Sequence, residues 1–412
     1  MTVRPLVIKF GGTSVGGGAQ FSRAATITAG AARNRPVTVV VSAMSGTTDT
    51  LLGVAEDVAY ATDGRTSYGA TSEGSIAELH RTLSERHLAA ARAAVAPQHL
   101  PAVEERLRAL LKSLVETLAE PYENPAARRA RVAVYGERLS AEILAGAVST
   151  SGVPAAVVAE DPIATDDAFD EAEVDAAGTA SRCSRLVAPL LESGSVVVVP
   201  GYVGRSPQGA PTTLGRGGSD LSATALGRAL GSEEVWIMSD VDGVLDADPR
   251  LVPDANLMPR LSYREASLFA SLGAKVLHPK TMEPAAEAGI EVLVRNTFNP
   301  ECAGTRVTEQ ETGPGVRCVA LRRRFAVGLP CAPGHEREAA ALVGIGTPNQ
   351  RDLKRGLKSL RRADLSPLHA GIATAGLVFV VGADAAETAL RALHEDLVTP
   401  AATLAPESGV VA

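Results

Sequence analysis

The chain contains few aromatic residues: phenylalanine, tryptophan and tyrosine together make up 3% of its 412 residues, with one tryptophan. Without large rings, the hydrophobic core has to be built mainly from Ala, Val, Leu and Ile, and such a core suits parallel strands covered by helices. The apolar fraction of 45% is ordinary for a globular protein. The length exceeds one ordinary core and predicts two or three domains.

Three further absences disfavour whole classes of function. The four cysteines form no Cys-x-x-Cys pair, which leaves no signal for a zinc site and favours reduced thiols. No apolar run is long enough for a signal peptide or a membrane-spanning helix. The net charge is −7 and no basic segment dominates, which disfavours nucleic-acid binding. We therefore expect a cytoplasmic protein with neither a nucleic-acid nor a membrane partner.

Strands and helices alternate along residues 1–310, which predicts an α/β domain with a mostly parallel sheet. The runs Pro5–Phe10 and Val37–Met44 have the pattern of buried strands, and Ser22–Arg33 and Thr47–Ala61 that of the helices after them. Residues 63–125 instead show helical spacing of Leu and Ala and predict a helical insertion. Further strands are expected at 156–159, 196–202, 235–239 and 291–295, and further helices at 219–230, 263–272 and 279–288.

The pattern of expected strands and helices changes after a polar segment at 309–315, which predicts a second domain at 316–412. Strands are expected at 316–329, 340–345 and 377–381, and helices at 352–363 and 385–396. This order predicts a small α+β module.

The first candidate site motif is Lys9-Phe10-Gly11-Gly12-Thr13-Ser14, at the end of the first strand. Glycines let backbone N–H groups approach an anion closely, and the lysine adds a positive charge, so the motif suits a phosphate group. An ordinary Gly-Gly turn is the alternative. The segment is not a Walker A loop, because Gly17 stands where that motif has lysine.

Two motifs are ambiguous by themselves. Ser42–Asp49 follows the second strand, where ligands bind in open α/β folds, but its hydroxyl groups are equally suited to capping the next helix. Glu137, preceded by Gly136 at a helix start, suits a substrate ammonium group, but the helix dipole also favours a glutamate there.

The most informative motif is Thr212-Thr213-Leu214-Gly215-Arg216-Gly217-Gly218-Ser219-Asp220, which joins a strand to a helix. Its glycines expose the Arg216 guanidinium and the backbone amides together, and arginine can clamp a carboxylate with two parallel hydrogen bonds. A helix start also favours anions. Asp220 then lies where it can organise a metal or the reacting groups.

Two later segments have nucleotide-binding character. Ser239-Asp240-Val241-Asp242-Gly243-Val244 ends a strand in an acidic loop and precedes Arg250, although a solvated acidic turn has the same composition. Gly273–Pro279 contains Lys275, a second candidate phosphate lysine, and His278, which we interpret as structural.

Taken together and in this order, these segments resemble aspartokinases, a group within the amino-acid kinase family. The matching segments are Lys9–Val15, Ser42–Thr48, Gly136–Ser140, Thr212–Asp220, Ser239–Val244, Asp248–Arg250, Gly273–Pro279 and Asn296–Phe298. The resemblance implies the amino-acid kinase fold and ATP-dependent phosphorylation of the side-chain carboxylate of L-aspartate, giving 4-phospho-L-aspartate. It also implies that 63–125 is the insertion of the longer family members.

The resemblance also implies residue roles. Lys9 and Asp220 would be catalytic, with Lys9 stabilising the transferring phosphoryl group. Arg216 would bind the α-carboxylate of the substrate and Glu137 its α-ammonium. The other expected substrate contacts are Thr48, Gly217, Gly218 and Ser219. The expected nucleotide contacts are Lys9, Gly11, Gly12, Ser14, Ser239, Asp240, Leu245, Arg250 and Lys275. ATP and Mg²⁺ are the expected cofactors, and Mg²⁺ would be held mainly by the ATP phosphates rather than by protein ligands.

This set suits the chemistry. A carboxylate nucleophile has a pKa near ~4, is ionised at pH 7 and needs no general base. The obstacle is bringing one anion up to another, so catalysis must come from positioning and charge neutralisation.

Two departures from the family stand out. Leu245 occupies a position beside the nucleotide where the family usually has tyrosine. The C-terminal region is short: Leu342–Asp396 resembles one ACT module, and only strand-like remnants of a second are visible at Val319–Cys331. We therefore expect feedback inhibition by lysine or threonine to be weak or absent. An ACT-like tail also predicts a homodimer, or a higher homo-oligomer, formed through the C-terminal domain.

Two alternatives remain at this point. The same fold and chemistry can act on a close aspartate analogue in a dedicated biosynthetic pathway. The chain can also be a non-catalytic regulatory subunit, although its phosphate-binding residues are intact. Glu137 and Arg216 together favour a free α-amino acid over N-acetylated substrates and carbamate.

Overall fold

The structure is a computed structural model that describes residues 3–62, 72–120, 124–272, 278–310, 313–325, 339–373 and 376–398. The chain forms two compact units, one of Met1–Val241 and Lys280–Cys302 and the other of Asp242–Pro279 and Ala303–Ala412. The domain boundary expected near residue 310 stays a prediction.

The first unit is built around parallel strands, and it confirms the predicted α/β class. Six of its strands lie side by side, and every neighbouring pair is parallel. Across the sheet they are β11 (Glu291–Asn296), β9 (Glu234–Ser239), β1 (Leu6–Phe10), β2 (Val37–Val41), β6 (Val196–Pro200) and β3 (Ala155–Val157). Because their carboxyl ends meet at one edge, the loops that follow β1, β2 and β6 are brought together there.

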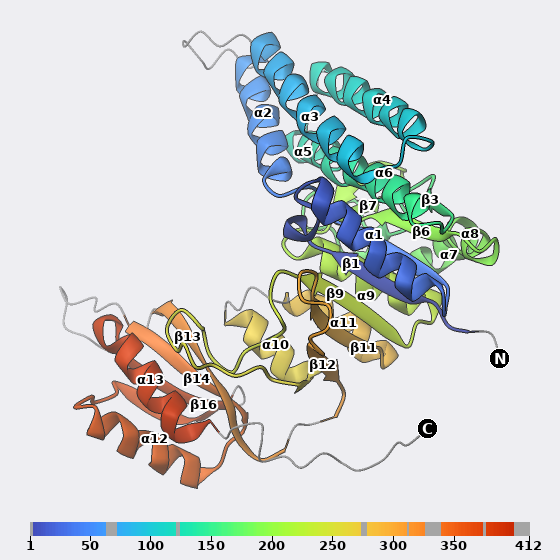
Figure 1. Cartoon of the computed structure of the whole chain (residues 1–412). Helices are drawn as coiled ribbons and strands as arrows, with labels where there is room; N and C mark the ends of the chain where they lie inside the picture. Colours follow the sequence, from blue (N-terminus) through green and yellow to red (C-terminus); the bar gives the residue numbers. More distant parts are fainter. Residues whose placement is uncertain are drawn as a thin grey trace. The chain divides into compact units, whose positions relative to one another are not determined.

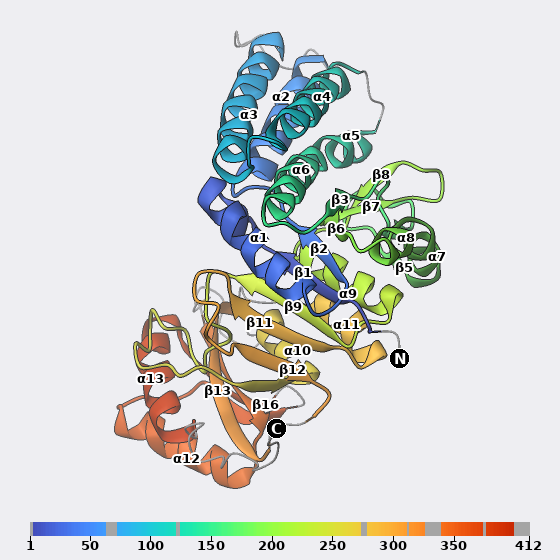
Figure 2. The same ribbon diagram turned by 45° about the vertical axis from the view of Figure 1, so that its right-hand side comes forward.

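Helices cover both faces of this sheet, and Figure 2 shows β1 and β2 between α1 (Gly18–Ala32) and α9 (Gly218–Leu230). Alternate strand residues point to opposite faces. Leu6, Ile8 and Phe10 of β1 belong to the hydrophobic core that includes residues of α1 and α6 (Tyr135–Thr150). Lys9 therefore points to the opposite face, where α9 packs against β1, β2 and β9.

A layer of further helices packs against α1 and α6, and both ribbon views show it (Figures 1 and 2). Its helices are α2 (Thr47–Thr62), α3 (Ser72–Ala94), α4 (Leu100–Ala119) and α5 (Pro125–Ala133). In α4, Leu107, Leu111, Leu114 and Leu118 recur at helical spacing and are all buried. Residues 63–71 and 121–123 of the expected insertion lie outside the described residues.

A small second sheet completes the first unit next to the carboxyl edge of β6. Its strands, in order, are β5 (Val174–Asp175), β4 (Ala164–Thr165), β7 (Val203–Arg205) and β8 (Pro211–Thr213). The remaining helices of the region are α7 (Ala176–Leu186), α8 (Ala188–Glu192) and α11 (Pro279–Ala288), with the short 3₁₀ helix η1 (Gly12–Val15) after β1. The β7–β8 hairpin matters for function because β8 leads directly into Leu214–Asp220.

The second unit contains an antiparallel sheet with helices α12 (Gln350–Arg362) and α13 (Ala386–Leu397), which pack on each other; a short 3₁₀ helix, η2 (Ala383–Ala385), precedes α13. The strands, in order, are β13 (Gly315–Phe325), β14 (Ala339–Thr347), β16 (Gly376–Gly382) and β15 (His369–Ala373). The same unit contains β10 (Arg260–Ser262), α10 (Tyr263–Ser271) and β12 (Thr305–Thr308). The antiparallel sheet with α12 and α13 confirms the predicted α+β module. Residues 326–329 of the first expected strand lie outside the described residues.

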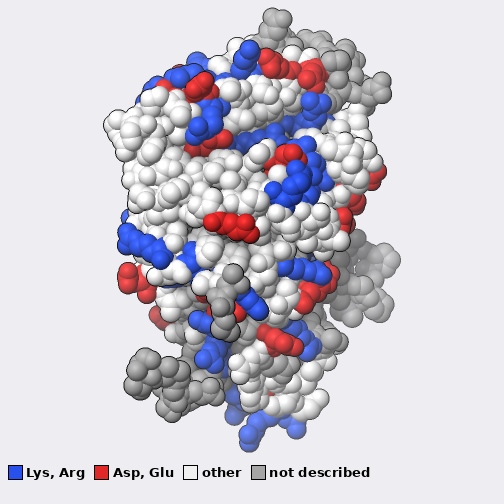
Figure 3. All heavy atoms as spheres, turned by 90° about the vertical axis from the view of Figure 1, so that its right-hand side faces the viewer, with Lys and Arg blue, Asp and Glu red and all other residues white. Residues whose placement is uncertain are grey.

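None of the helices in the described parts of the chain combines the length and the hydropathy that crossing a membrane requires. On the face drawn in Figure 3, Lys and Arg side chains lie interspersed with Asp and Glu side chains.

Candidate active site

A cavity of about 740 Å³ lies in the first unit, at the carboxyl edge of its parallel strands. Four of the sequence motifs contribute to it, from the loops after β1 and β2, the start of α6 and the β8–α9 loop. Its predicted residues are Lys9, Gly12, Thr48, Glu137, Arg216, Gly217, Gly218, Ser219 and Asp220. All six residues expected to contact an amino-acid substrate thus line a single cavity.

Lys9 and Asp220 form an ion pair in this cavity. The distance from Lys9 Nζ to Asp220 Oδ1 is 2.5 Å, and the two side chains are only 12% and 13% exposed. Lys9 comes from β1 and Asp220 from the first turn of α9. The pairing neutralises a largely buried cation and holds the ammonium group at the wall of the cavity.

Glu137 is the most deeply buried acid of the cavity. It lies in the first turn of α6, and the whole residue is 3% exposed. Burial raises the pKa of its carboxyl to about 8, although the backbone N–H groups of Ala43 and Glu137 hydrogen-bond to it. A buried carboxyl of this kind gains most from a cationic partner, because charging it alone is costly.

The β8–α9 loop takes its shape from two glycines. Gly215 and Gly217 have φ angles of 72° and 71°, in the left-handed region that side chains disfavour, and Gly217 is the N-cap of α9. Between them, Arg216 is exposed and lines the cavity. The sharp turn therefore presents the guanidinium next to a helix start, as the sequence predicts for an anion-binding loop.

The loop after β2 forms the opposite part of the cavity lining. The backbone N–H of Ser42 donates to the carbonyl of Phe10 at 3.1 Å, which ties this loop to the end of β1. Arg86 of α3 donates to the carbonyl of Ser45 at 2.8 Å. Thr48, in the first turn of α2, lines the cavity with Ser42 and Ser45.

The residues expected to bind the nucleotide are spread more widely. Gly11 adjoins Lys9, because a Cβ at Gly11 would lie 3.4 Å from Lys9 Nζ. Ser14 is fully buried, and its hydroxyl is 2.7 Å from that of Thr297. Ser239 and Asp240 follow β9, where the Ser239 hydroxyl donates to the Asp240 carboxylate at 3.3 Å.

Leu245 and Arg250 belong to the second unit. The Leu245 backbone pairs with Leu257, and the Arg250 guanidinium is bound by both carboxylate oxygens of Asp248, at 2.9 and 2.6 Å. Lys275 lies outside the described residues. The nucleotide-binding roles of all three stay predictions.

Several cavity residues are absent from the sequence-based set. Tyr202 follows β6 and has a φ of 67°, rare for a residue with a side chain. Arg129 of α5 forms an ion pair with Asp170. The position of Tyr202 after a buried strand could have revealed it, whereas Arg129 and Asp170 lie in segments without a recognisable motif. The remaining cavity-lining residues outside the set include Asp49, Glu171 and Thr213.

Within the described residues, no group of three or more His, Cys, Asp or Glu side chains is arranged to hold a metal ion. Of the acids that line the cavity, Asp220 pairs with Lys9, Asp170 pairs with Arg129, and Glu137 accepts hydrogen bonds from backbone N–H groups.

Comparison with known proteins defines the class. A family model described as "Amino acid kinase family" matches residues 4–296. Aspartokinase from Chlamydia trachomatis is 31% identical over 328 residues, which cover 78% of this chain and 70% of that protein. The chain belongs to the amino acid kinase family, and proteins named aspartokinase are among its relatives.

Two more proteins extend this comparison. Aspartokinase 1, chloroplastic, from Arabidopsis thaliana is 35% identical over 307 residues, which cover 74% of this chain and 52% of that protein. The chain spans about half the length of the first such relatives it matches, 52–54%. E. coli aspartokinase III, in complex with lysine and aspartate, has a TM-score of 0.78 at 25% identity, covering 96% of this chain and 99% of that structure.

Proposed function

We propose that the chain is an aspartate kinase, which transfers the γ-phosphoryl group of ATP to the side-chain carboxylate of L-aspartate. A carboxylate oxygen attacks the γ-phosphorus, the bond from that phosphorus to the β–γ bridging oxygen breaks, and ADP leaves. The products are 4-phospho-L-aspartate and ADP. One observation carries the proposal: Lys9, Glu137 and Arg216 all open into one cavity.

Each of these three residues matches one charged group of the reactants. Arg216 matches the α-carboxylate of an amino acid, because a guanidinium binds a carboxylate through parallel hydrogen bonds. Glu137 matches the α-ammonium group, which would relieve the cost of its buried charge. Lys9 matches the phosphoryl group, on which negative charge is spread in the transition state. A free α-amino acid with an anionic side chain fits this combination.

The reaction needs no general base, because the side-chain carboxylate is already ionised at neutral pH. The residues of the cavity therefore act by binding and orientation. Asp220 keeps the Lys9 ammonium group in one position through the 2.5 Å ion pair. Holding the carboxylate and the phosphorus in contact removes much of the entropic cost of bringing two anions together.

ATP would enter as its magnesium complex, with the metal held by the phosphate oxygens. The absence of an acidic metal cluster among the described residues is compatible with a metal that arrives on the substrate. Ser239 and Asp240, at the carboxyl end of β9, are proposed to contact the nucleotide, and so are Gly11 and Gly12 after β1.

The experiment is to trap the acyl phosphate with hydroxylamine in the presence of ATP and Mg²⁺, across a panel of amino acids. The panel contains L-aspartate, L-glutamate, N-acetyl-L-glutamate and aspartate analogues. We expect the largest kcat/KM with L-aspartate. If another member of the panel is turned over with a higher kcat/KM, that compound replaces L-aspartate as the proposed substrate. ATP binding without turnover of any panel member would contradict the proposal that the chain is a kinase.

Assembly and location are also proposals. We expect a homodimer or a higher homo-oligomer formed through the predicted C-terminal domain, residues 316–412, and a cytoplasmic enzyme. Light scattering coupled to size-exclusion chromatography tests the first point, and removal of residues 316–412 should then give monomers.

A further inference from the structure

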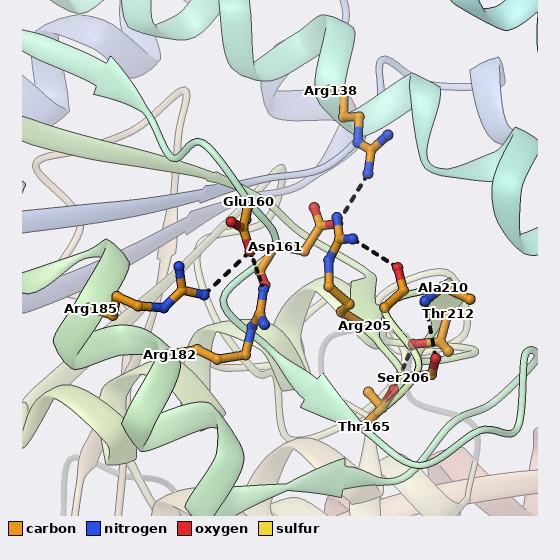
Figure 4. Close-up of polar contacts among 11 residues, drawn as sticks. Arg138, Glu160, Asp161, Thr165, Arg182, Arg185, Arg205, Ser206, Ala210 and Thr212 are labelled. Carbon is orange, nitrogen blue, oxygen red and sulfur yellow. Dashed lines mark hydrogen bonds and ion pairs between the residues drawn. The ribbon is translucent and has the colours of Figure 1, made fainter.

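Asp161 has a buried carboxylate that forms ion pairs with two arginines from different elements (Figure 4). Its side chain is 6% exposed. Arg138 Nη2 and Arg205 Nη2 each donate to the same oxygen, Asp161 Oδ2, at 3.0 Å. Arg182 Nε donates to the backbone carbonyl of Asp161, also at 3.0 Å, and so fixes the main chain at this point.

The two arginines come from two elements that contribute to the candidate active site or lead into it. Arg138 is the residue after Glu137 in α6. Arg205 ends β7 and pairs through its backbone with Pro211 of β8, the strand that leads to Arg216. Asp161 itself does not line the active-site cavity. Through its two ion pairs it connects the element bearing Glu137 to the hairpin that leads to Arg216.

Arg205 also fixes the hairpin from which the loop emerges. Its Nη1 donates to the carbonyl of Gly209 at 2.8 Å, within the β7–β8 turn. The Arg138 and Arg205 side chains are 26% and 24% exposed, so both cations are mostly removed from water. Without the Asp161 carboxylate the two cations would face each other without a counter-charge, and their repulsion would separate α6 from the hairpin.

We propose that Asp161 is a positioning residue for the amino-acid substrate. By holding Arg138 and Arg205 at one oxygen atom, it sets the separation between Glu137 and Arg216, which on the proposed function bind the two ends of the same α-amino acid. We expect its effect to fall on the affinity for that substrate, because the proposed function assigns ATP to the loops after β1 and β9. The positioning of Glu137 and Arg216 by Asp161 is inferred from the contacts alone, and only the identity of the substrate rests on the proposed function.

The test compares Asp161→Asn with Glu160→Gln in the full chain. Asn keeps the shape of Asp and removes its charge. Glu160 is the matched control, because it is the neighbouring acid and also accepts from two arginines, Arg182 at 3.0 Å and Arg185 at 3.3 Å, but on the surface. We expect Asp161→Asn to raise KM for L-aspartate roughly tenfold, with KM for ATP within about twofold of the wild type. Glu160→Gln should leave both values unchanged.

A second readout is independent of activity. Hydrogen exchange should become faster at residues 134–140 and 211–220 in Asp161→Asn and not in Glu160→Gln. If the wild type proves inactive, the proposed function fails. Hydrogen exchange still tests whether Asp161 positions α6 and the β8–α9 loop. If Asp161→Asn does not fold, Arg205→Gln, which leaves the Asp161–Arg138 pair in place, should give the same selective rise in KM.

Two results would overturn the inference. One is an unchanged KM for L-aspartate in folded Asp161→Asn, with only a lower melting temperature or a smaller active fraction. The other is hydrogen exchange in the β8–α9 loop that is the same in both variants.

Discussion

Lys9 Nζ lies 2.5 Å from Asp220 Oδ1, and this ion pair joins the end of β1 to the first turn of α9. The two residues are far apart in the sequence, and the parallel sheet brings them together because α9 packs against β1. Asp220 fixes the position of the Lys9 ammonium group, which on our account meets the transferring phosphoryl group.

Replacing Lys9 with Met should therefore abolish catalysis while the fold is retained. We expect kcat to fall by about 10³-fold or more, because a preorganised charge at the reacting group is lost. Lys280→Met is the control, since Lys280 also pairs with an acid, Glu173 at 2.8 Å, but outside the cavity. Equal losses in the two variants would show that Lys9 has no special role.

The buried state of Glu137 predicts a pH dependence of substrate binding. Burial raises its pKa to about 8 in the empty cavity, whereas an ammonium ligand requires the carboxylate form. As the pH falls below about 8, Glu137 takes up a proton and KM for L-aspartate should rise, by up to about tenfold per pH unit. Measurements of KM at saturating MgATP check this. Glu137→Gln should bind L-aspartate poorly and lose the slope, and an identical slope in both proteins would refute the assignment.

The same pKa predicts that Glu137 destabilises the folded protein at high pH. Its pKa is raised from 4.5 to about 8 on folding, so the folded state holds the proton more tightly. The cost of charging Glu137 is absent below the unfolded pKa, grows as the pH rises, and is complete above the folded pKa. Glu137→Gln should thus increase the free energy of unfolding at pH ~8 by up to about 4 kcal/mol, and by less at pH ~5. Denaturant titrations at the two pH values measure the difference, and a gain independent of pH would contradict it.

Close packing around Gly12 predicts that any side chain at this position lowers the stability of the protein. A Cβ at Gly12 would lie 2.9 Å from the backbone carbonyl oxygen of Ala43, the residue whose N–H hydrogen-bonds to Glu137. We expect Gly12→Ala to destabilise the protein by ~1–3 kcal/mol and to raise KM for L-aspartate. Gly30→Ala in α1, where a Cβ meets nothing within 4 Å, should instead stabilise by ~0.5–1 kcal/mol. Equal effects at the two sites would rule out this explanation.

The short C-terminal region leads us to expect weak feedback inhibition. Its described part contains one four-stranded antiparallel sheet with α12 and α13. The first strand of this sheet, β13, lies partly in the segment expected to be the remnant of a second module, and the single-module interpretation stays a prediction. Lysine is the first effector to test, because it is named in the complex of E. coli aspartokinase III. We expect titration with L-lysine or L-threonine to change the rate with L-aspartate by less than about twofold, within RT ln 2 or ~0.4 kcal/mol of coupling. Strong inhibition by either amino acid would contradict this expectation.

The sequence reveals the part of the fold that depends on local pattern. Buried Val-rich runs identify β2 and β6, and the glycine-rich segment around Arg216 identifies the β8–α9 loop, because left-handed turns need glycine. The sequence does not reveal β15, whose segment His369–Ala373 is mostly exposed and lacks apolar alternation. Its strand conformation comes from pairing with β16.

The site shows the same division. Lys9, Glu137 and Arg216 belong to motifs, and the fold brings the end of β1, the start of α6 and the β8–α9 loop to one cavity. Tyr202 and Asp161 belong to no motif. Glu160 and Asp161 look alike in the sequence, and only the packing of α6 and β7 determines that Asp161 is the buried one.

The most direct test of the proposed function is to identify the product formed from L-aspartate. Incubation with ATP, Mg²⁺ and hydroxylamine, followed by mass spectrometry, distinguishes a hydroxamate at the side-chain carboxylate from one at the α-carboxylate. The account predicts the side-chain hydroxamate, formed together with ADP and missing when Lys9→Met replaces the wild type. Formation of the α-hydroxamate, or ADP release without any hydroxamate from L-aspartate, would contradict it.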